Sequence, residues 1–506
     1  QDEPLFPEIV EYHGQAVAWV LAESEAIARR AALEVVVDAE PLDPIVTIEQ
    51  AIERDAFLAH ELKIERLQDG RDDIEAALAA CPHRSRGEVQ IGGQEHFYLE
   101  AQAALVYVDE GDQVMVHAST QHPTETQLIV ARVLGVPSHA VPCQSLRMGG
   151  AFGGKEVQAN TWACVAAVGA VKTGRPVRVR LDRQRDMALT GKRHPFLGRY
   201  EVGYDDEGRI LALNAELFSD GGWSLDLSQP VLARALFHID NCYDFPSLRV
   251  TGRVCKTNKT SQTAFRGFGG NQATFAVESQ LDRLAHAAGL HPAELRRRNL
   301  RTPQDPGVEG QTQQQPCDPR LLLDAALQSP LWASASSTDD SRWVTGVGMA
   351  MGAQGNGLGN GLPDAGGARL TLTDDGRIEL AFGFIEYGQG VIAAIRNLAC
   401  DYLHCAPEDL DIRLGDSSGP DSGPTSASRS SIIAVEALRR LQPQWRALLT
   451  SLAPPATPGL QPGPGGLRDQ SGELVISYPQ LAGAGTPVTL NVHFDFPTGP
   501  DATPRG

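Results

Sequence analysis

Three glycine-dense segments carry polar and aromatic side chains that could take part in chemistry. They span 91–100 (I-G-G-Q-E-H-F-Y-L-E), 148–156 (M-G-G-A-F-G-G-K-E) and 263–270 (T-A-F-R-G-F-G-G). Glycine runs let the backbone approach a ligand closely and turn N–H groups toward anionic oxygens. One such segment is most simply a tight turn. Three of them, each with polar or aromatic residues amid glycine, indicate the walls of one buried pocket.

Two patterns that imitate other sites fail in detail. Residues 149–155 have the G-x-x-x-x-G-K spacing of a phosphate-binding loop, but Glu156 follows where Ser or Thr should hold magnesium. Residues 415–420 resemble the nucleophile segment of a trypsin-like serine protease, but serine replaces its second glycine and no matching histidine segment lies upstream. We therefore set aside the nucleotide-binding and serine-protease interpretations.

Composition limits the class of protein. The chain has 506 residues, 42% apolar and 21% charged, which fits a globular protein of about three domains. An excess of 63 acidic over 44 basic residues gives a net charge of −19 and argues against a nucleic-acid partner. The sequence has no apolar run long enough to span a membrane. Its eight cysteines include no C-x-x-C pair, which disfavours a zinc or iron–sulfur site held by this chain and fits a reducing cytoplasm.

Local signals indicate alternating strands and helices. We expect an opening β-α-β unit, with strands at 16–21 and 34–39 around a helix capped by Ser24, and then a charged surface connection at 61–73. We also expect hairpins that join 200–204 to 210–217 and 369–373 to 377–382, and strands at 113–119, 177–181 and 488–496. Helices are expected at 125–134, 157–171, 272–288, 292–299, 321–327, 391–403 and 432–449, the first with a capping box of Thr124 and Gln127. Residues 453–466 should form a Pro/Gly loop.

At its glycine motifs the sequence resembles the molybdenum-binding (large) subunit of the xanthine dehydrogenase/aldehyde oxidase family of molybdenum hydroxylases. Four motifs match in the family's order: G-G-Q-E-H-F-Y-L-E, M-G-G-A-F-G-G-K-E, R-A-L-F-H-I-D-N-C-Y and T-A-F-R-G-F-G-G. Shorter matches lie at 190–197, 386–390 and 424–428. The resemblance covers nearly the whole chain, and it is strong from Gly87 to Leu300 and looser after Arg342.

The resemblance implies an elongated multi-domain protein of α/β (α+β mixed) class, and the two ends of the sequence suggest truncation at both. Residues 1–60 would be the C-terminal part of the N-terminal α/β hammerhead domain. Residues 84–302 would form the first molybdopterin-binding domain, 303–342 a connection, and 343–506 an incomplete second molybdopterin-binding domain.

The resemblance also implies a cofactor, which is molybdenum with a sulfido ligand, held by molybdopterin. The dithiolene of the pterin binds the metal, in agreement with the lack of cysteine pairs, and the protein supplies the surrounding hydrogen bonds and charges. By motif match, the residues at the metal would be Gln94, Phe152, Gly153, Arg266 and Ala427. Those that bind the pterin and its phosphate would be Gln389, Ser428 and Ser430.

Three further residues match positions that contact substrate in the family. Glu156 follows the second glycine segment as in purine-oxidising members, and Arg234 matches the residue opposite it. Negative charge builds on the ring during hydroxylation, so a guanidinium in a dry pocket would stabilise it and a carboxyl group would orient a ring nitrogen. Phe268 would contact the face of the ring. Without the resemblance, an ordinary ion pair between Glu156 and Arg234 is the simpler interpretation.

The sequence departs from the family in two places. Xanthine-oxidising relatives have a Ser-Phe-Thr segment where this chain has 355–361 (G-N-G-L-G-N-G), which puts Leu358 near the Phe position and Gly359 near the Thr position. A purine-like heterocycle is therefore better supported than xanthine itself. The family's general base is a Glu in a Gly-Glu-Pro-Pro segment, but no Glu follows Glu473, so we expect the base beyond residue 506.

The resulting expectation is an enzyme that hydroxylates a purine, xanthine or hypoxanthine, with oxygen from water, using Glu156 and Arg234 as catalytic residues. Electrons would pass to 2Fe-2S and FAD on partner subunits or domains, in a dimer of such heteromers. The alternatives are hydroxylation of another N-heterocycle or of an aldehyde, and a non-catalytic cofactor-binding fragment.

Overall fold

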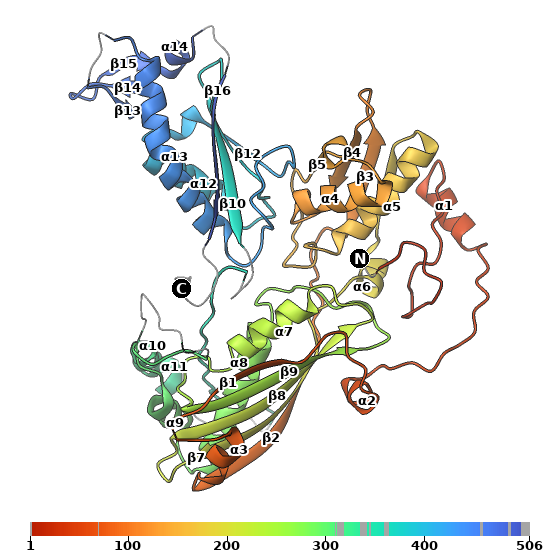
Figure 1. Cartoon of the computed structure of the whole chain (residues 1–506), viewed down its shortest axis with the longest axis vertical. Coiled ribbons are helices and arrows are strands. Elements are labelled where there is room, and N and C mark those ends of the chain that lie inside the picture. Colours follow the sequence, from red (N-terminus) through yellow and green to blue (C-terminus); the bar gives the residue numbers. More distant parts are fainter. Residues whose placement is uncertain are drawn as a thin grey trace.

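The computed structural model describes residues 3–68, 70–308, 310, 318–333, 342–343, 346–358, 364–455, 459–483 and 487–496. In these ranges the chain forms a large sheet with its helices and two smaller α/β units beyond it (Figure 1). The α/β mixed class expected from the sequence is confirmed. None of the helices in the described ranges is long and apolar enough to cross a membrane.

The large sheet has five strands in the order β1-β9-β8-β7-β2. Alternate side chains of β8 face opposite sides: Leu213 lies in the core beneath α7 and α8, whereas Ala212 packs against α3. The predicted hairpin is confirmed as β7 and β8. The elements are β1 (Leu62–Arg66), β2 (His83–Ile91), β7 (Phe196–Tyr204), β8 (Ile210–Gly222), β9 (Ser247–Lys256), α2 (Ile48–Glu53), α3 (Ile74–Ala79), α7 (Ser228–Phe237), α8 (Gly270–Ala287) and α9 (Pro292–Asn299).

A second sheet, in the order β5-β4-β3-β6, carries α4 and α5. The predicted capping box is wrong: α4 begins at Pro123 after His122, and the Gln127 amide donates to the carbonyl of Ser138 at 3.0 Å. Proline fits this first helical position because it has no N–H to leave unpaired. The elements are β3 (Ala103–Val108), β4 (Val114–Ala118), β5 (Cys143–Gln144), β6 (Val177–Arg180), α4 (Pro123–Leu134), α5 (Ala159–Thr173), α6 (Arg183–Leu189) and a 3-10 turn at Ser138–Ala140.

A third sheet, in the order β12-β11-β10-β16, packs on α12 and α13, and both helices were expected. The expected loop at 453–466 was partly wrong, since β13 and the start of a second small strand lie in it. The elements are β10 (Ala365–Leu372), β11 (Ile378–Phe382), β12 (Leu410–Leu414), β16 (Val488–Asp495), β13 (Gln461–Gly463), β14 (Gly466–Arg468), β15 (Leu474–Ser477), α12 (Val391–Leu403), α13 (Ser430–Leu452), α14 (Tyr478–Ala482) and a 3-10 turn at Pro407–Asp409.

The opening β-α-β prediction is also wrong. Helix α1 (Glu25–Ala32) forms with Ser24 as its cap, but 16–21 and 34–39 belong to no sheet, and the Val36 side chain is 91% exposed. The expected connection at 61–73 instead contains β1, which pairs with β9. The helix expected at 321–327 is confirmed as α10 (Pro319–Leu327), and α11 (Pro330–Ala333) follows it.

Candidate functional site

The second and third glycine segments touch through their backbones. Phe152 and Gly153 both have left-handed φ angles, 56° and 101°. A Cβ on Gly153 would lie 2.7 Å from the carbonyl oxygen of Ala264, so glycine is needed there. The N–H of Arg266 donates to the carbonyl of Phe152 at 2.9 Å. Three of the predicted residues at the metal, Phe152, Gly153 and Arg266, therefore lie together.

The first glycine segment joins them through Gln94 and His96. The Oε1 of Gln94 accepts from Nε of Arg193 at 2.6 Å, and the Arg193 guanidinium lies 3.9 Å from the centre of the Phe265 ring. The ring of His96 stacks on Phe265 at 4.3 Å and bonds to the carbonyl of Ala264 at 2.7 Å. The structure thus brings all three glycine segments into contact.

Gln121 links this cluster to the loop between β12 and α13, although no pattern in the sequence pointed to it. Its Oε1 accepts the N–H of Gly153 at 3.0 Å, and its Nε2 donates to the carbonyl of Thr425 at 2.9 Å. Ile385 and Tyr387 bind the same residue: Ile385 N–H donates to Thr425 Oγ1 at 2.9 Å and the Tyr387 hydroxyl donates to its carbonyl at 3.2 Å. The 424–428 loop is thereby attached to the second glycine segment.

Ala427 and Ser428 lie in this loop with consecutive left-handed φ angles of 53° and 55°, and Ser430 begins α13. Arg429 between them is only 1% exposed. Its guanidinium binds Asp364 at 2.6 Å and the carbonyls of Ser422, Pro424 and Ala365. Arg429, like Gln121, was not recognised from the sequence. Its contacts hold the strained backbone at Ala427 and Ser428.

Gln389 lies in the turn before α12, and its side chain binds the backbone of that same turn. Its side chain accepts from the N–H of Tyr387 at 2.8 Å and donates to the carbonyl of Ile385 at 2.9 Å.

The carboxylate of Glu386 occupies the start of α12. Burial opposes its ionisation, but backbone N–H donors that include Ile392 outweigh burial and lower the pKa of Glu386. Tyr387 packs with Met148 and Ala151, which places this turn beside the second glycine segment.

Glu156 follows the second glycine segment in a desolvated environment. Burial raises the pKa of its carboxyl group to about 7, while the Ser426 hydroxyl and the charge of His122 partly offset the effect. Near neutral pH a large fraction of Glu156 is therefore protonated and can donate a hydrogen bond. Its negative charge also contributes to the raised pKa of Tyr387, after burial.

Arg234 is 9% exposed and lies on α7. Its Nη1 donates to the carbonyl of Gly355 at 2.9 Å, its Nη2 donates to the carbonyl of Gly357, and its guanidinium is 5.8 Å from the centre of the Phe268 ring. Among the described residues no ion pair joins Arg234 to Glu156, so the simple ion-pair interpretation does not hold. Leu358 is half-buried, and Gly359 lies outside the described residues.

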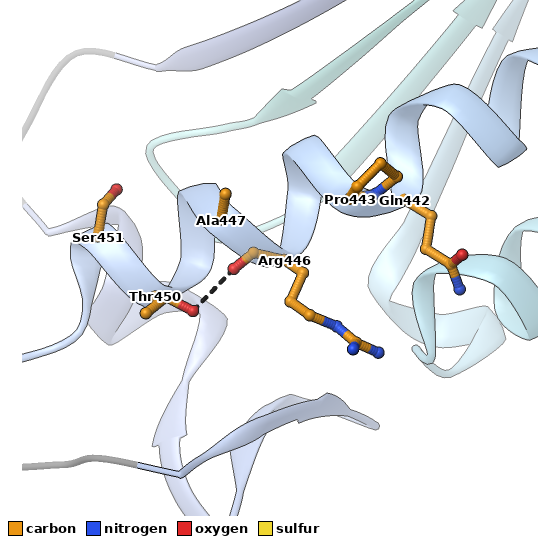
Figure 2. Close-up of a pocket in the computed structure, with 6 residues that line it drawn as sticks. All are labelled: Gln442, Pro443, Arg446, Ala447, Thr450 and Ser451. Carbon is orange, nitrogen blue, oxygen red and sulfur yellow. Dashed lines mark hydrogen bonds between the residues drawn. The ribbon is translucent and has the colours of Figure 1, made fainter.

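A hollow on the surface of α13 is separate from this cluster. It is lined by Gln442, Pro443, Arg446, Ala447, Thr450 and Ser451 along the second half of the helix (Figure 2). Thr450 Oγ1 donates to the carbonyl of Arg446 there at 2.9 Å. None of the residues expected at the functional site lines this hollow.

Comparison with known proteins identifies the family to which the chain belongs. Two consecutive family models match the chain, at residues 58–300 and 326–492, and both describe a molybdopterin cofactor-binding domain. The chain is 35% identical over its full length to a probable xanthine dehydrogenase subunit of Bacillus subtilis (strain 168), of which it covers 68%. The chain belongs to the molybdenum-binding subunits of the xanthine dehydrogenase/aldehyde oxidase family.

Other relatives of this molybdenum-binding subunit are longer. It is 38% identical over 84% of its length to xanthine dehydrogenase of Drosophila subobscura, but covers only 32% of that protein. The aldehyde oxidoreductase of Desulfovibrio desulfuricans ATCC 27774 has a TM-score of 0.84 at 26% identity, covering 99% of this chain and 54% of that chain. The aldehyde oxidoreductase of Desulfovibrio gigas has a TM-score of 0.79 at 27% identity, with 93% and 51% covered.

The molybdopterin-binding domains carry buried positive charge that fits an anionic cofactor. Arg193 is 6% exposed, its Nη1 has no hydrogen-bond partner in the described residues, and burial lowers its pKa to about 10. Burial likewise lowers the pKa of Arg234. In the described ranges neither guanidinium pairs with a carboxylate, although the chain as a whole carries a charge of −19. Since an uncompensated buried charge is costly, a bound anion would stabilise this arrangement.

Proposed function

We propose that this chain binds a molybdenum–molybdopterin cofactor with a sulfido ligand and hydroxylates a purine, xanthine or hypoxanthine, with oxygen taken from water. The single observation that carries the substrate class is the Arg234 guanidinium, which is 9% exposed and makes no ion pair in the described residues. The raised pKa of Glu156, about 7 because of burial, supports the same assignment. A protonated acid can donate to an acceptor nitrogen of a heterocycle, and a cation that is not paired with a carboxylate can stabilise an oxygen of the same ring.

The cofactor, when bound, supplies the redox chemistry that accepts two electrons from the substrate. The chain's own residues would surround it. Gln94, Phe152, Gly153, Arg266 and Ala427 would line the metal end, and Gln389, Ser428 and Ser430 would bind the pterin and its phosphate. In support, Gly153, Arg266 and Gln94 lie in segments that contact one another, and Ala427 lies in the loop that Gln121 attaches to them.

Glu156 and Arg234 would hold the substrate during the reaction, and Phe268 would contact its face. The Arg234 guanidinium has five N–H donors, of which two bind Gly355 and Gly357. Those that remain could stabilise negative charge on an oxygen of the ring. Protonated Glu156 could donate to a ring nitrogen and so fix the orientation of the substrate.

Electrons would leave through 2Fe-2S and FAD carried by partner subunits, in a dimer of heteromers. The Bacillus subtilis relative is itself named as one subunit of a probable xanthine dehydrogenase, which supports a multi-subunit assembly. Six cysteines in the described residues, Cys81, Cys143, Cys164, Cys255, Cys400 and Cys405, are free thiols, which fits a cytoplasmic location. We retain the proposed division into 1–60, 84–302, 303–342 and 343–506.

The test compares substrates on the assembled enzyme. We expect turnover of hypoxanthine and xanthine, and a loss in Arg234→Met and Glu156→Leu that is much larger for purines than for an aldehyde such as benzaldehyde, because neither replacement can donate a hydrogen bond. Arg297→Met, which removes a half-exposed arginine of α9, is the matched control. Equal losses on both substrate classes would contradict the purine assignment. Turnover of another N-heterocycle alone would favour the alternative suggested by Leu358 in place of an aromatic residue.

A further inference from the structure

An extended segment, residues 349–357, lies along α7 and is here called the strap. Its residues alternate without a break: Met349, Met351, Ala353, Gly355 and Gly357 are half-buried or buried, and those between them are exposed. The side chains of Met349, Met351 and Ala353 pack against the core that includes α7 and α8. A period of two is typical of a strand with one covered face, although the strap is assigned to no sheet.

Three side chains from α7 and the turn after it hold the strap by its backbone. Asn241 donates to the carbonyl of Met351 at 3.0 Å and accepts the N–H of Ala353 at 2.8 Å. His238 accepts the N–H of Gly355 on Nε2 at 3.0 Å. Arg234 then binds the carbonyls of Gly355 and Gly357.

His238 is the central residue of this set. Because its Nε2 accepts a hydrogen bond from a backbone N–H, the proton of the neutral ring lies on Nδ1, which donates to the carbonyl of Arg234 at 2.8 Å. The His238 ring therefore binds both the backbone of Arg234 and Gly355 of the strap. The Arg234 guanidinium binds the same Gly355. Burial lowers the pKa of His238, with a further contribution from the charge of Arg234, which favours this neutral form.

The far end of the strap reaches the 424–428 loop. The N–H of Gly357 donates to the carbonyl of Ala427 at 3.0 Å. The strap thus connects the residue proposed to bind substrate, Arg234, with a residue proposed to line the metal, Ala427. A shift of the strap would change the direction of the guanidinium and the donors left for a substrate.

We propose that His238 is a positioning residue for substrate binding, because it fixes the strap that orients the Arg234 guanidinium. This inference rests on the proposed function of Arg234. It assigns substrate affinity to a histidine that would act through Arg234 and the strap.

The experiment uses the assembled, cofactor-loaded enzyme with three substitutions at one position. His238→Leu removes both ring hydrogen bonds. His238→Gln places an amide oxygen where Nε2 accepts from Gly355, and His238→Asn keeps only a donor near Nδ1. His286→Leu, at an exposed position in the last turn of α8, is the matched control. Amide hydrogen exchange of peptides covering the strap and the kcat and KM for hypoxanthine are measured for each.

We expect His238→Leu and His238→Asn to speed exchange at the strap and to raise KM by roughly fivefold to tenfold, the effect of one lost hydrogen bond, with kcat changed less. His238→Gln should restore both values toward those of the unaltered enzyme. Unchanged exchange in His238→Leu, or equal KM in the Leu and Gln variants, would overturn the proposal. If the enzyme oxidises an aldehyde or another heterocycle but no purine, the proposed function fails, while the same comparison with that substrate still decides the role of His238.

Discussion

Gln121 and Thr425 bind each other twice. The Gln121 amide donates to the carbonyl of Thr425 at 2.9 Å, and the N–H of Thr425 donates to the backbone carbonyl of Gln121 at 3.0 Å. Gln121 also accepts the N–H of Gly153, so a single buried side chain joins the two molybdopterin-binding domains beside the glycine segments. The geometry of the candidate site therefore depends on polar contacts between domains as well as on the glycine motifs.

Gln121→Leu should destabilise the protein and lower its cofactor content. The substitution removes the acceptor of the Gly153 N–H and one of the two side-chain donors to the Thr425 carbonyl, which keeps the Tyr387 hydroxyl. Two lost hydrogen bonds cost about 1–3 kcal/mol in the free energy of unfolding. Molybdenum per chain and denaturant-induced unfolding measure the two effects. Gln127→Leu, which loses one bond to Ser138 near the surface, is the control. Equal behaviour of the two variants would argue against the bridging role of Gln121.

Gly153→Ala should impair cofactor binding more than it impairs folding. The new Cβ would lie 2.7 Å from the Ala264 carbonyl oxygen, and φ at this position is 101°, so the two glycine segments must separate. Gly472→Ala provides the control, because φ there is 86° but no atom lies within 4 Å of the added Cβ. We expect molybdenum content to fall in Gly153→Ala alone. Full molybdenum content in that variant would show that the close approach is dispensable.

Arg429→Met should be strongly destabilising. The buried carboxylate of Asp364 would lose its guanidinium partner, and removing one member of a buried pair costs about 3–5 kcal/mol. Arg439→Met, which breaks an exposed contact with Glu436 on the same helix, should have a much smaller effect. Thermal unfolding of both variants tests this contrast. A small change in melting temperature for Arg429→Met would mean that the 424–428 loop is held by other contacts.

Glu156 should give the enzyme a pH dependence that Glu156→Gln lacks. An unfolded chain ionises this group near 4.5, whereas the folded protein keeps the proton until about pH 7 because burial disfavours the charge. Folded stability should therefore fall, relative to Glu156→Gln, as pH rises from about 4.5 to about 7 and stay level above that range. Unfolding by denaturant at several pH values measures the difference. Parallel pH profiles for the two proteins would contradict a raised pKa.

The glycine motifs could be predicted from the sequence because their function is local. Left-handed backbone at Gly150, Gly153 and Gly267 requires glycine wherever the rest of the chain lies. Gln121 and Arg429 could not be recognised in this way. The Gln121 amide binds a residue 304 positions away and Arg429 binds one 65 positions away, so only the folded chain reveals their partners.

The errors in the fold have a similar cause. Residues 34–39 are apolar enough for a strand, but a strand also needs a neighbour with which to pair, and in the described residues this segment has none. Conversely, β1 lies in the charged stretch 61–73 that was expected to be a surface connection, although Lys63 and Glu65 alternate with Leu62 and Ile64 as in a strand. It pairs along one side only, with β9, and charged residues are common on such edge strands.

The most direct test of the central claim is the origin of the oxygen added to the substrate. The assembled enzyme is incubated with hypoxanthine and an artificial electron acceptor in water enriched in ¹⁸O, and the products are analysed by mass spectrometry. We expect molybdenum-dependent formation of xanthine that carries one ¹⁸O atom from the solvent. Purine left unchanged by the molybdenum-loaded enzyme, or product labelled from dioxygen instead of water, would contradict the account.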